Sequence, residues 1–183
     1  MHAERPVRKT ERLRRGRETI PGATYFITAC IQNRAPVLVD PTNALTLLDA
    51  WQELAAASDI TPLAFTIMPD HCHGLFALGE RLSLARVVAK LKTRGRPAGA
   101  SWSWQDNVFE HRLRAKESAE DYAFYIFMNA YRAGLISTDQ RWPRWQGATA
   151  MKWDFENKLS PIGTPPPEWL EQMVTLRERV TTR

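Results

Sequence analysis

The chain has 183 residues, of which 44% are hydrophobic and 25% charged, a composition typical of one soluble globular domain. No stretch approaches the roughly 20 apolar residues of a membrane span, and no apolar segment follows the charged N-terminus as in a signal peptide. Two cysteines, Cys30 and Cys72, are too few for a disulfide scaffold and favour a reducing compartment. We therefore expect a cytoplasmic protein with no membrane partner.

The net charge of +5 is concentrated at the N-terminus. Residues 1–17 contain two glutamates and seven basic side chains, and the rest of the chain balances 18 basic against 18 acidic residues. The basic residues of this arm are Arg5, Arg8, Lys9, Arg12, Arg14, Arg15 and Arg17. A basic arm on a neutral body is typical of a protein with a polyanionic partner, although a solvated tail has the same composition.

The first half of the chain predicts three strands and one helix. Residues Thr24–Ile31 are β-branched and aromatic and predict a strand. Apolar residues at helical spacing after Asp40 predict a helix that runs to about Ser58. Two further strands, Pro62–Ile67 and His71–Leu78, flank a Met-Pro-Asp turn and therefore predict a hairpin.

The second half predicts two helices separated by a strand. An apolar stripe from Leu84 to Leu91 predicts a helix, Val108–Leu113 a strand, and Ser118 caps a third helix that ends at Gly134. This order predicts an α+β, ferredoxin-like split βαβ fold, an antiparallel sheet with helices packed on one face. We expect an arm over 1–17, a catalytic domain over 18–140 and an extension over 141–183. In the extension, Pro165–Pro167 lead into a short helix predicted to run through Arg179.

The sequence His71-Cys72-His73 is the first feature that suggests chemistry. On a strand, residues i and i+2 point to one face while i+1 points to the other. Both imidazoles then converge on one site, and Cys72 points away from it. Such a pair suits a metal ion, although two histidines on a strand are more often ordinary surface residues.

The second feature is the pair Tyr125 and Asn129 in the third predicted helix. Residues four apart lie on the same helix face, so an amide oxygen and a phenol are neighbours there. Several aromatic residues surround this pair, and a packed aromatic helix explains the local pattern equally well.

Four segments taken together resemble one protein family. These are Thr24–Ile31 followed by Asn33-Arg34; Met68-Pro69-Asp70-His71-Cys72-His73-Gly74-Leu75; Trp104-Gln105 with His111-Arg112-Leu113-Arg114; and Tyr125-Ile126-x-x-Asn129-x-x-Arg132-Ala133-Gly134-Leu135. In order and spacing they resemble REP-associated tyrosine transposases, relatives of the IS200-type single-tyrosine transposases of the HUH class. The resemblance covers roughly residues 12 to 140. The sequence departs from the usual family pattern at three positions. Asp70 stands where the family usually has Asn, Glu110 where it usually has Asp, and Ala130 where it commonly has Pro. Without proline at position 130, the tilt of the helix is less constrained.

The resemblance implies a role for each matching residue. His71 and His73 would be the two metal-binding histidines, Asn129 the third ligand and Tyr125 the nucleophile. The metal implied is Mg²⁺ or Mn²⁺. The implied reaction cleaves and rejoins single-stranded DNA at palindromic hairpins through a 5′-phosphotyrosine, in a bacterial protein associated with the nucleoid. We expect His111 to be structural rather than catalytic.

Basic and aromatic residues outside this set are candidates for DNA contacts. Arg12, Arg14, Arg15 and Arg17 of the arm are predicted to bind the hairpin. Arg86, Lys90 and Arg94 follow one helix face at i,i+4 steps and predict a phosphate track, although a solvated helix face has the same pattern. Trp142, Trp145 and Trp153 are candidates for base stacking, with at least one expected to be buried.

Three other functions stay open from the sequence. A DNA-hairpin-binding protein with the same fold would not require His71, His73, Asn129 and Tyr125 together. An RNA-binding domain would carry an aromatic RNP motif, which the chain lacks. A metal-dependent phosphoesterase would release free ends without a protein adduct. For the transposase interpretation we expect a monomer, and a dimer stays open.

Overall fold

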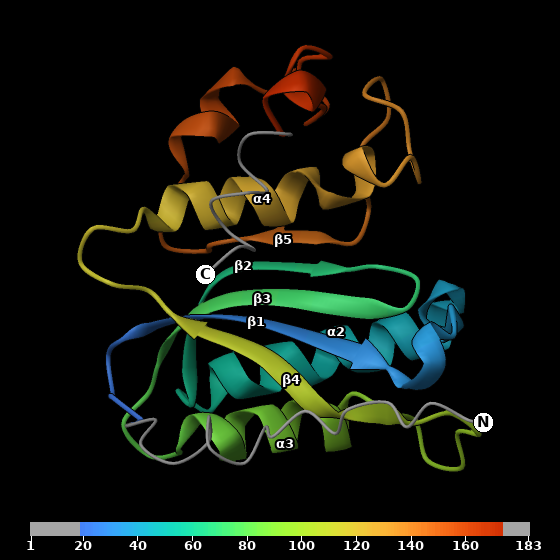
Figure 1. Cartoon of the computed structure of the whole chain (residues 1–183), viewed down its shortest axis with the longest axis vertical. Coiled ribbons are helices and arrows are strands. Elements are labelled where there is room, and N and C mark those ends of the chain that lie inside the picture. Colours follow the sequence, from blue (N-terminus) through green and yellow to red (C-terminus); the bar gives the residue numbers. More distant parts are fainter. Residues whose placement is uncertain (1–18, 174–183) are drawn as a thin grey trace, which may run out of the picture.

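The computed structural model describes residues 19–173, in which five strands form one sheet (Figure 1). The strands are β1 (Thr24–Ile31), β2 (Ile60–Ile67), β3 (His71–Leu78), β4 (Trp104–Arg112) and β5 (Trp145–Gly147). They lie in the order β4-β1-β3-β2-β5, and every neighbouring pair is antiparallel. The predicted split βαβ arrangement with an antiparallel sheet is therefore confirmed, and β5 extends it by one strand.

Among residues 19–173, six named helices pack around the sheet, and residues 169–173 are also helical. The six named helices are η1 (Gln32–Arg34), η2 (Val37–Val39), α2 (Pro41–Ala56), α3 (Leu84–Arg94), α4 (Ala119–Arg132) and η3 (Asp154–Lys158). Asp40 caps α2 by accepting from the amides of Thr42 and Asn43, and Ser118 caps α4 by accepting from Asp121. None of the helices within residues 19–173 has the length and apolar character that crossing a membrane requires.

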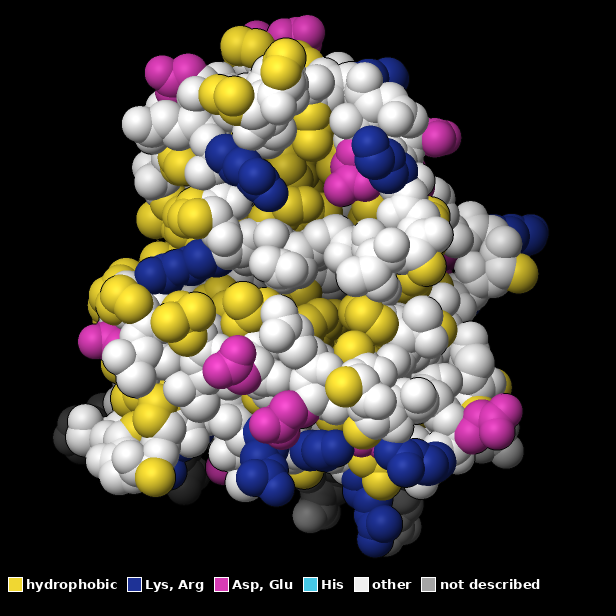
Figure 2. Space-filling view, turned by 180° about the vertical axis from the view of Figure 1, so that it is seen from behind, with side chains coloured by type: hydrophobic (Ala, Val, Ile, Leu, Met, Phe, Trp, Pro, Cys, Tyr) yellow, Lys and Arg dark blue, Asp and Glu magenta, His cyan; other side chains and the backbone are white. Residues whose placement is uncertain are grey.

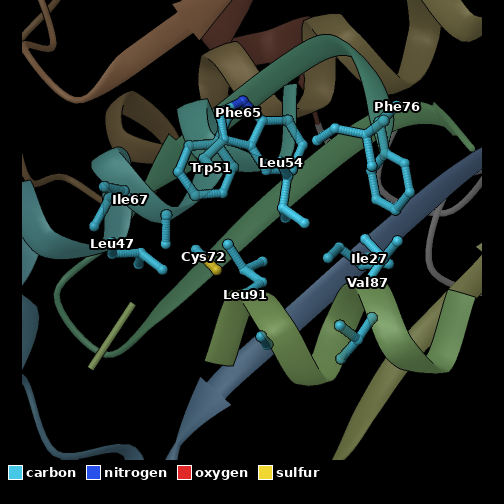
Figure 3. Close-up of a cluster of buried hydrophobic side chains, with 14 of the residues drawn as sticks. Ile27, Leu47, Trp51, Leu54, Phe65, Ile67, Cys72, Phe76, Val87 and Leu91 are labelled. Atoms are coloured by element: carbon cyan, nitrogen blue, oxygen red, sulfur yellow. The ribbon is translucent and has the colours of Figure 1, made fainter. Parts of the chain in front are cut away.

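One face of the sheet is covered by α2 and α3. The core on this side joins Ile27, Trp51, Phe65, Phe76 and Leu91, with the Trp51 ring stacked on Phe65 at a centroid distance of 4.3 Å (Figure 3). These side chains are completely or almost completely buried, so this core is the main source of apolar stabilisation on that face.

The opposite face is covered by α4, which differs from the prediction that all helices share one face. Strand residues that point away from the α2 and α3 side, including Phe26 and Leu75, pack in one cluster with Tyr125 and Ile126 of α4. The predicted strands are apolar on both sides, so one helical layer cannot bury them all. The third helix therefore closes the second face and completes a three-layer structure (Figure 1).

Part of the predicted C-terminal extension belongs to this second layer. β5 pairs with β2, and Trp153, Phe155 and Trp169 pack in the same core as α4. The Trp153 indole is 4% exposed and donates to the Leu63 carbonyl at 3.1 Å, so this tryptophan is a core residue. Trp142 and Trp145 are half-buried against the same core. Residues 169–173 of the predicted C-terminal helix are helical, and the rest of that prediction, through Arg179, lies outside the described residues.

The turn after β3 depends on a glycine at position 79. A Cβ at Gly79 would lie 2.2 Å from the Ser58 carbonyl oxygen and 2.8 Å from that of Asp59. Neither backbone atom can move freely, so we expect Gly79→Ala to destabilise the protein by about 3 kcal/mol in urea unfolding. The control is Gly147→Ala, whose added methyl meets mainly the flexible Glu156 carboxylate at 2.9 Å and should cost much less. Equal losses in the two variants would contradict this account of the turn.

Candidate active site

The two histidines of β3 point to the face that α4 covers. His71 Nε2 and His73 Nε2 lie 3.1 Å apart, and the two rings meet edge to face. Cys72, between them in sequence, is fully buried in the core on the α2 and α3 side (Figure 3). The prediction that the imidazoles share one face while Cys72 points away is confirmed.

Each imidazole is also held by a contact of its Nδ1 atom with a neighbouring side chain. His71 Nδ1 lies 2.6 Å from Asp70 Oδ1, and the second oxygen of this carboxylate lies 2.9 Å from Arg34 Nε. His73 Nδ1 lies 2.8 Å from Thr28 Oγ1, because Thr28 of β1 pairs directly with His73 of β3. Since a carboxylate accepts only, His71 donates from Nδ1 and leaves its Nε2 lone pair facing His73.

Burial keeps both imidazoles neutral. Desolvation lowers the pKa of His71, partly offset by Asp70, and it lowers the pKa of His73 well below its ordinary value. The positive charges of Arg34 and Arg132 act in the same direction on both rings. Neutral imidazole is the form that binds a metal ion, so the pair is ready for a cation at neutral pH.

Helix α4 brings Tyr125 to the histidines. The Tyr125 ring meets the His73 ring at 71° with centroids 5.7 Å apart, and Phe26 packs against both rings. Tyr125 is only 5% exposed, and its ring lines the pocket that also contains both imidazoles. The phenol and the histidine pair, more than fifty residues apart in sequence, therefore form one site within one chain.

The same face of α4 carries Asn129 and Arg132. Arg132 Nη2 lies 3.3 Å from Asn129 Oδ1, and its guanidinium lies 5.8 Å from the centre of the Tyr125 ring. Asn129 Nδ2 and Arg132 Nε are buried without a hydrogen-bond partner. Buried donors are rarely left unpaired in folded proteins, so these two suggest that a ligand completes the site.

These side chains line a pocket of about 570 Å³. Its walls are Phe26, Thr28, Arg34, Met68, Pro69, Asp70, His71, His73, Phe109, Tyr125, Asn129, Arg132, Ala133 and Leu135. The pocket thus combines paired imidazoles, a phenol, two guanidinium groups and one carboxylate, a set suited to an anion together with a metal ion.

Comparison with known proteins agrees with this geometry. Residues 19–97 match the family model described as "Transposase IS200 like". A protein of Haemophilus influenzae described as a REP-associated tyrosine transposase is 27% identical over 144 residues, which cover 69% of this chain and 81% of the relative.

A solved structure shares the fold of this chain. It is a REP-associated tyrosine transposase bound to a REP hairpin, with a TM-score of 0.61 and 24% identity over 70% of this chain and 79% of that chain. At this identity the likeness supports the fold alone.

His111 and Tyr122 form a separate network next to the pocket. His111 Nε2 lies 2.9 Å from Glu117 Oε2, and the His111 ring stacks on Tyr122 at 5.7 Å. The Tyr122 hydroxyl donates to Glu117 at 3.4 Å, and neither ring is among the pocket walls. This network fastens the start of α4 to β4, which agrees with the structural role expected for His111.

The predicted DNA contacts on α3 lie on the other side of the sheet from the pocket. Arg86 and Arg94 are exposed, and Figure 2 shows Lys and Arg side chains gathered at the end of the molecule that carries α3. Lys90 instead donates to Asp59, a buried carboxylate, at 2.7 Å, and this hydrogen bond lowers the pKa of Asp59. Lys90 therefore has a structural partner. The arm residues Arg12, Arg14, Arg15 and Arg17 lie outside the described residues.

The sequence prediction assigned no role to the three charged side chains that line the pocket, Arg34, Asp70 and Arg132. Arg132 follows Asn129 by three residues and Tyr125 by seven, and this helical spacing could have placed it beside them. Arg34 and Asp70 lie within segments that carry the family resemblance, but no sequence signal shows that they pair with each other. Their pairing depends on how η1 and the β2–β3 turn meet in space.

Proposed function

We propose that this protein is a metal-dependent, single-tyrosine DNA strand transferase that acts on single-stranded DNA beside palindromic hairpins. The main support is the position of the Tyr125 ring against the His73 ring, with the Nε2 atoms of the histidine pair 3.1 Å apart. The match of residues 19–97 to the IS200-like transposase family model supports the reaction class. The related structure bound to a REP hairpin supports the substrate, by analogy of fold.

His71, His73 and Asn129 would hold the divalent metal, Mg²⁺ or Mn²⁺. The Nε2 atoms of the two histidines lie 3.1 Å apart on one face of β3, so both ring nitrogens could hold the same ion. Asn129 lines the same pocket as the two histidines, and its buried amide would supply the third protein ligand. When bound, the ion would neutralise charge on the scissile phosphate.

Tyr125 would be the nucleophile. Its hydroxyl oxygen would form a bond to phosphorus while the bond from phosphorus to the 3′ oxygen breaks, which leaves a 5′-phosphotyrosine and a free 3′-hydroxyl. The exchange of one phosphoester for another conserves the bond, so a 3′-hydroxyl can later reverse the step and join strands. The reaction needs no ATP, and the protein residues would orient the phosphate and the phenol.

The arrangement supports a monomer and argues against an RNA-recognition surface. Tyr125 meets His73 within one chain, so a partner subunit is not needed to complete the site. An RRM-type domain binds RNA on an open sheet face, whereas α2, α3 and α4 cover both faces of this sheet.

The test is the formation of a covalent protein–DNA adduct. End-labelled single-stranded oligonucleotides with a hairpin would be incubated with the protein and Mn²⁺, then separated under denaturing conditions. We expect a labelled band at the mass of the protein plus DNA, which disappears with a chelator. Cleavage without this band would indicate a phosphoesterase, and binding without cleavage would indicate a hairpin-binding protein.

The basic arm should contribute to affinity and not to chemistry. Deletion of residues 1–17 should weaken hairpin binding because fewer counterions are released when the protein contacts phosphates. Each lost phosphate contact should lower the log–log slope of affinity against salt by about 0.9 for duplex DNA. Fluorescence anisotropy across a salt series measures this slope, and an unchanged slope would show that the arm makes no phosphate contact.

A further inference from the structure

Arg132 occupies an unusual position for an arginine. It lies at the end of α4, where its Nε is buried without a partner and Nη2 lies 3.3 Å from Asn129 Oδ1. Within residues 19–173 no carboxylate forms a salt bridge with it, whereas Arg34 on the other side of the pocket pairs with Asp70. The guanidinium therefore contributes an uncompensated positive charge to the pocket.

We propose that Arg132 makes metal binding at this site depend on a DNA phosphate. This inference rests on the proposed function, in which Asn129 and the two histidines are the metal ligands. The guanidinium contacts the amide oxygen that the metal would use, so in the free protein it competes with the ion and repels it. A phosphodiester placed between them would attract both.

The charges of the pocket support this coupling. The proposed ligands are two neutral imidazoles and an amide, so none of them offsets the two positive charges of the ion. Among the pocket walls the charged groups are Arg34, Asp70 and Arg132, and the first two neutralise each other. The charge of Arg132 also reaches both imidazoles, where it disfavours added positive charge.

The unpartnered donors identify the ligand class that would relieve the repulsion. Arg132 Nε and Asn129 Nδ2 can both donate, and a phosphodiester offers two anionic oxygens. A guanidinium binds such oxygens in a bidentate manner, which would draw Arg132 from Asn129 Oδ1 toward the phosphate. The metal and the DNA strand would then bind together more tightly than either binds alone.

Thermodynamic linkage makes the proposal quantitative. If DNA raises the metal affinity by some factor, the metal raises the DNA affinity by the same factor, and such factors are commonly about 5 to 150. We expect Arg132→Gln to raise the Mn²⁺ affinity of the DNA-free protein by about fivefold or more. The same change should reduce the DNA-dependent increase in Mn²⁺ affinity by at least a similar factor.

The experiment measures free Mn²⁺ by electron paramagnetic resonance, with and without a single-stranded hairpin oligonucleotide. All proteins would carry Tyr125→Phe so that no cleavage occurs, and Mn²⁺ bound by the oligonucleotide alone would be subtracted. Arg132→Lys keeps the charge and should retain the weak Mn²⁺ binding of the DNA-free protein. Lys158→Gln, an exposed residue of η3 outside the pocket, controls for a change of net charge and should have no effect.

The outcomes separate this inference from the function on which it rests. Absence of Mn²⁺ binding in every variant, with or without DNA, would overturn the metal site and both proposals. Mn²⁺ binding with equal affinities in the parent and Arg132→Gln proteins would overturn the role of Arg132 alone. A lower affinity of the DNA-free Arg132→Gln protein would show that Arg132 supports the ion and would also contradict the proposal.

Discussion

Tyr125→Phe is expected to abolish covalent attachment to DNA and strand cleavage, a fall of at least about a thousandfold that leaves no detectable product. The change removes one oxygen, the proposed nucleophile, and keeps the ring that packs against Phe26 and His73. Fold stability and hairpin affinity should therefore change little. Adduct formation on denaturing gels and binding by anisotropy measure the two properties separately.

Tyr122→Phe is the matched control for this prediction. Tyr122 lies on the same helix and also packs against Phe26, but its hydroxyl points to Glu117 and its ring is not a wall of the pocket. We expect this variant to form the adduct at nearly the parent rate. Loss of the adduct in Tyr122→Phe with retention in Tyr125→Phe would move the nucleophile by one turn of α4.

His71→Ala is expected to remove metal-dependent cleavage almost completely, because one of two imidazole ligands is lost and Asn129 cannot replace it. Removal of a catalytic metal ligand should exceed the 10- to 100-fold loss typical of a residue that only orients a ligand. The measurement is the cleavage rate across a series of Mn²⁺ concentrations. Parent-like cleavage at low Mn²⁺ would contradict the assignment of His71 as a ligand.

Asp70→Asn is expected to have a smaller effect on metal-dependent cleavage than His71→Ala. An amide oxygen can still accept from His71 Nδ1, but the negative charge that pairs with Arg34 at 2.9 Å is lost. We expect Mn²⁺ affinity to fall by about tenfold while saturating Mn²⁺ restores much of the rate. A loss that Mn²⁺ cannot restore would instead indicate a direct role for the carboxylate in the reaction.

Short-range patterns allowed much of this fold to be predicted. Strand periodicity placed His71 and His73 on one face and Cys72 on the other, because the alternation of side chains depends only on local backbone geometry. Capping chemistry gave the start of α4 at Ser118, and helical spacing placed Tyr125 and Asn129 on a shared face. Each of these features involves residues that are close in sequence.

Features that depend on tertiary contacts could not be predicted in the same way. The hydrogen bond between Thr28 and His73 depends on the register between β1 and β3. The hydrogen bond from Lys90 to Asp59 joins α3 to the residue before β2. The position of α4 on the second face follows from the apolar character of both sides of the strands. β5 has three residues, too few for a periodic pattern.

The most direct test of the central claim is to locate the DNA on the protein. After incubation with Mn²⁺ and a hairpin oligonucleotide, nuclease and trypsin digestion should leave a nucleotide on the peptide of residues 117–132, which contains Tyr122, Tyr125 and Tyr131. Fragmentation in a mass spectrometer assigns the modified tyrosine. We predict a 5′-phosphonucleotide on Tyr125, and cleavage of the oligonucleotide with an unmodified peptide would contradict the proposed mechanism.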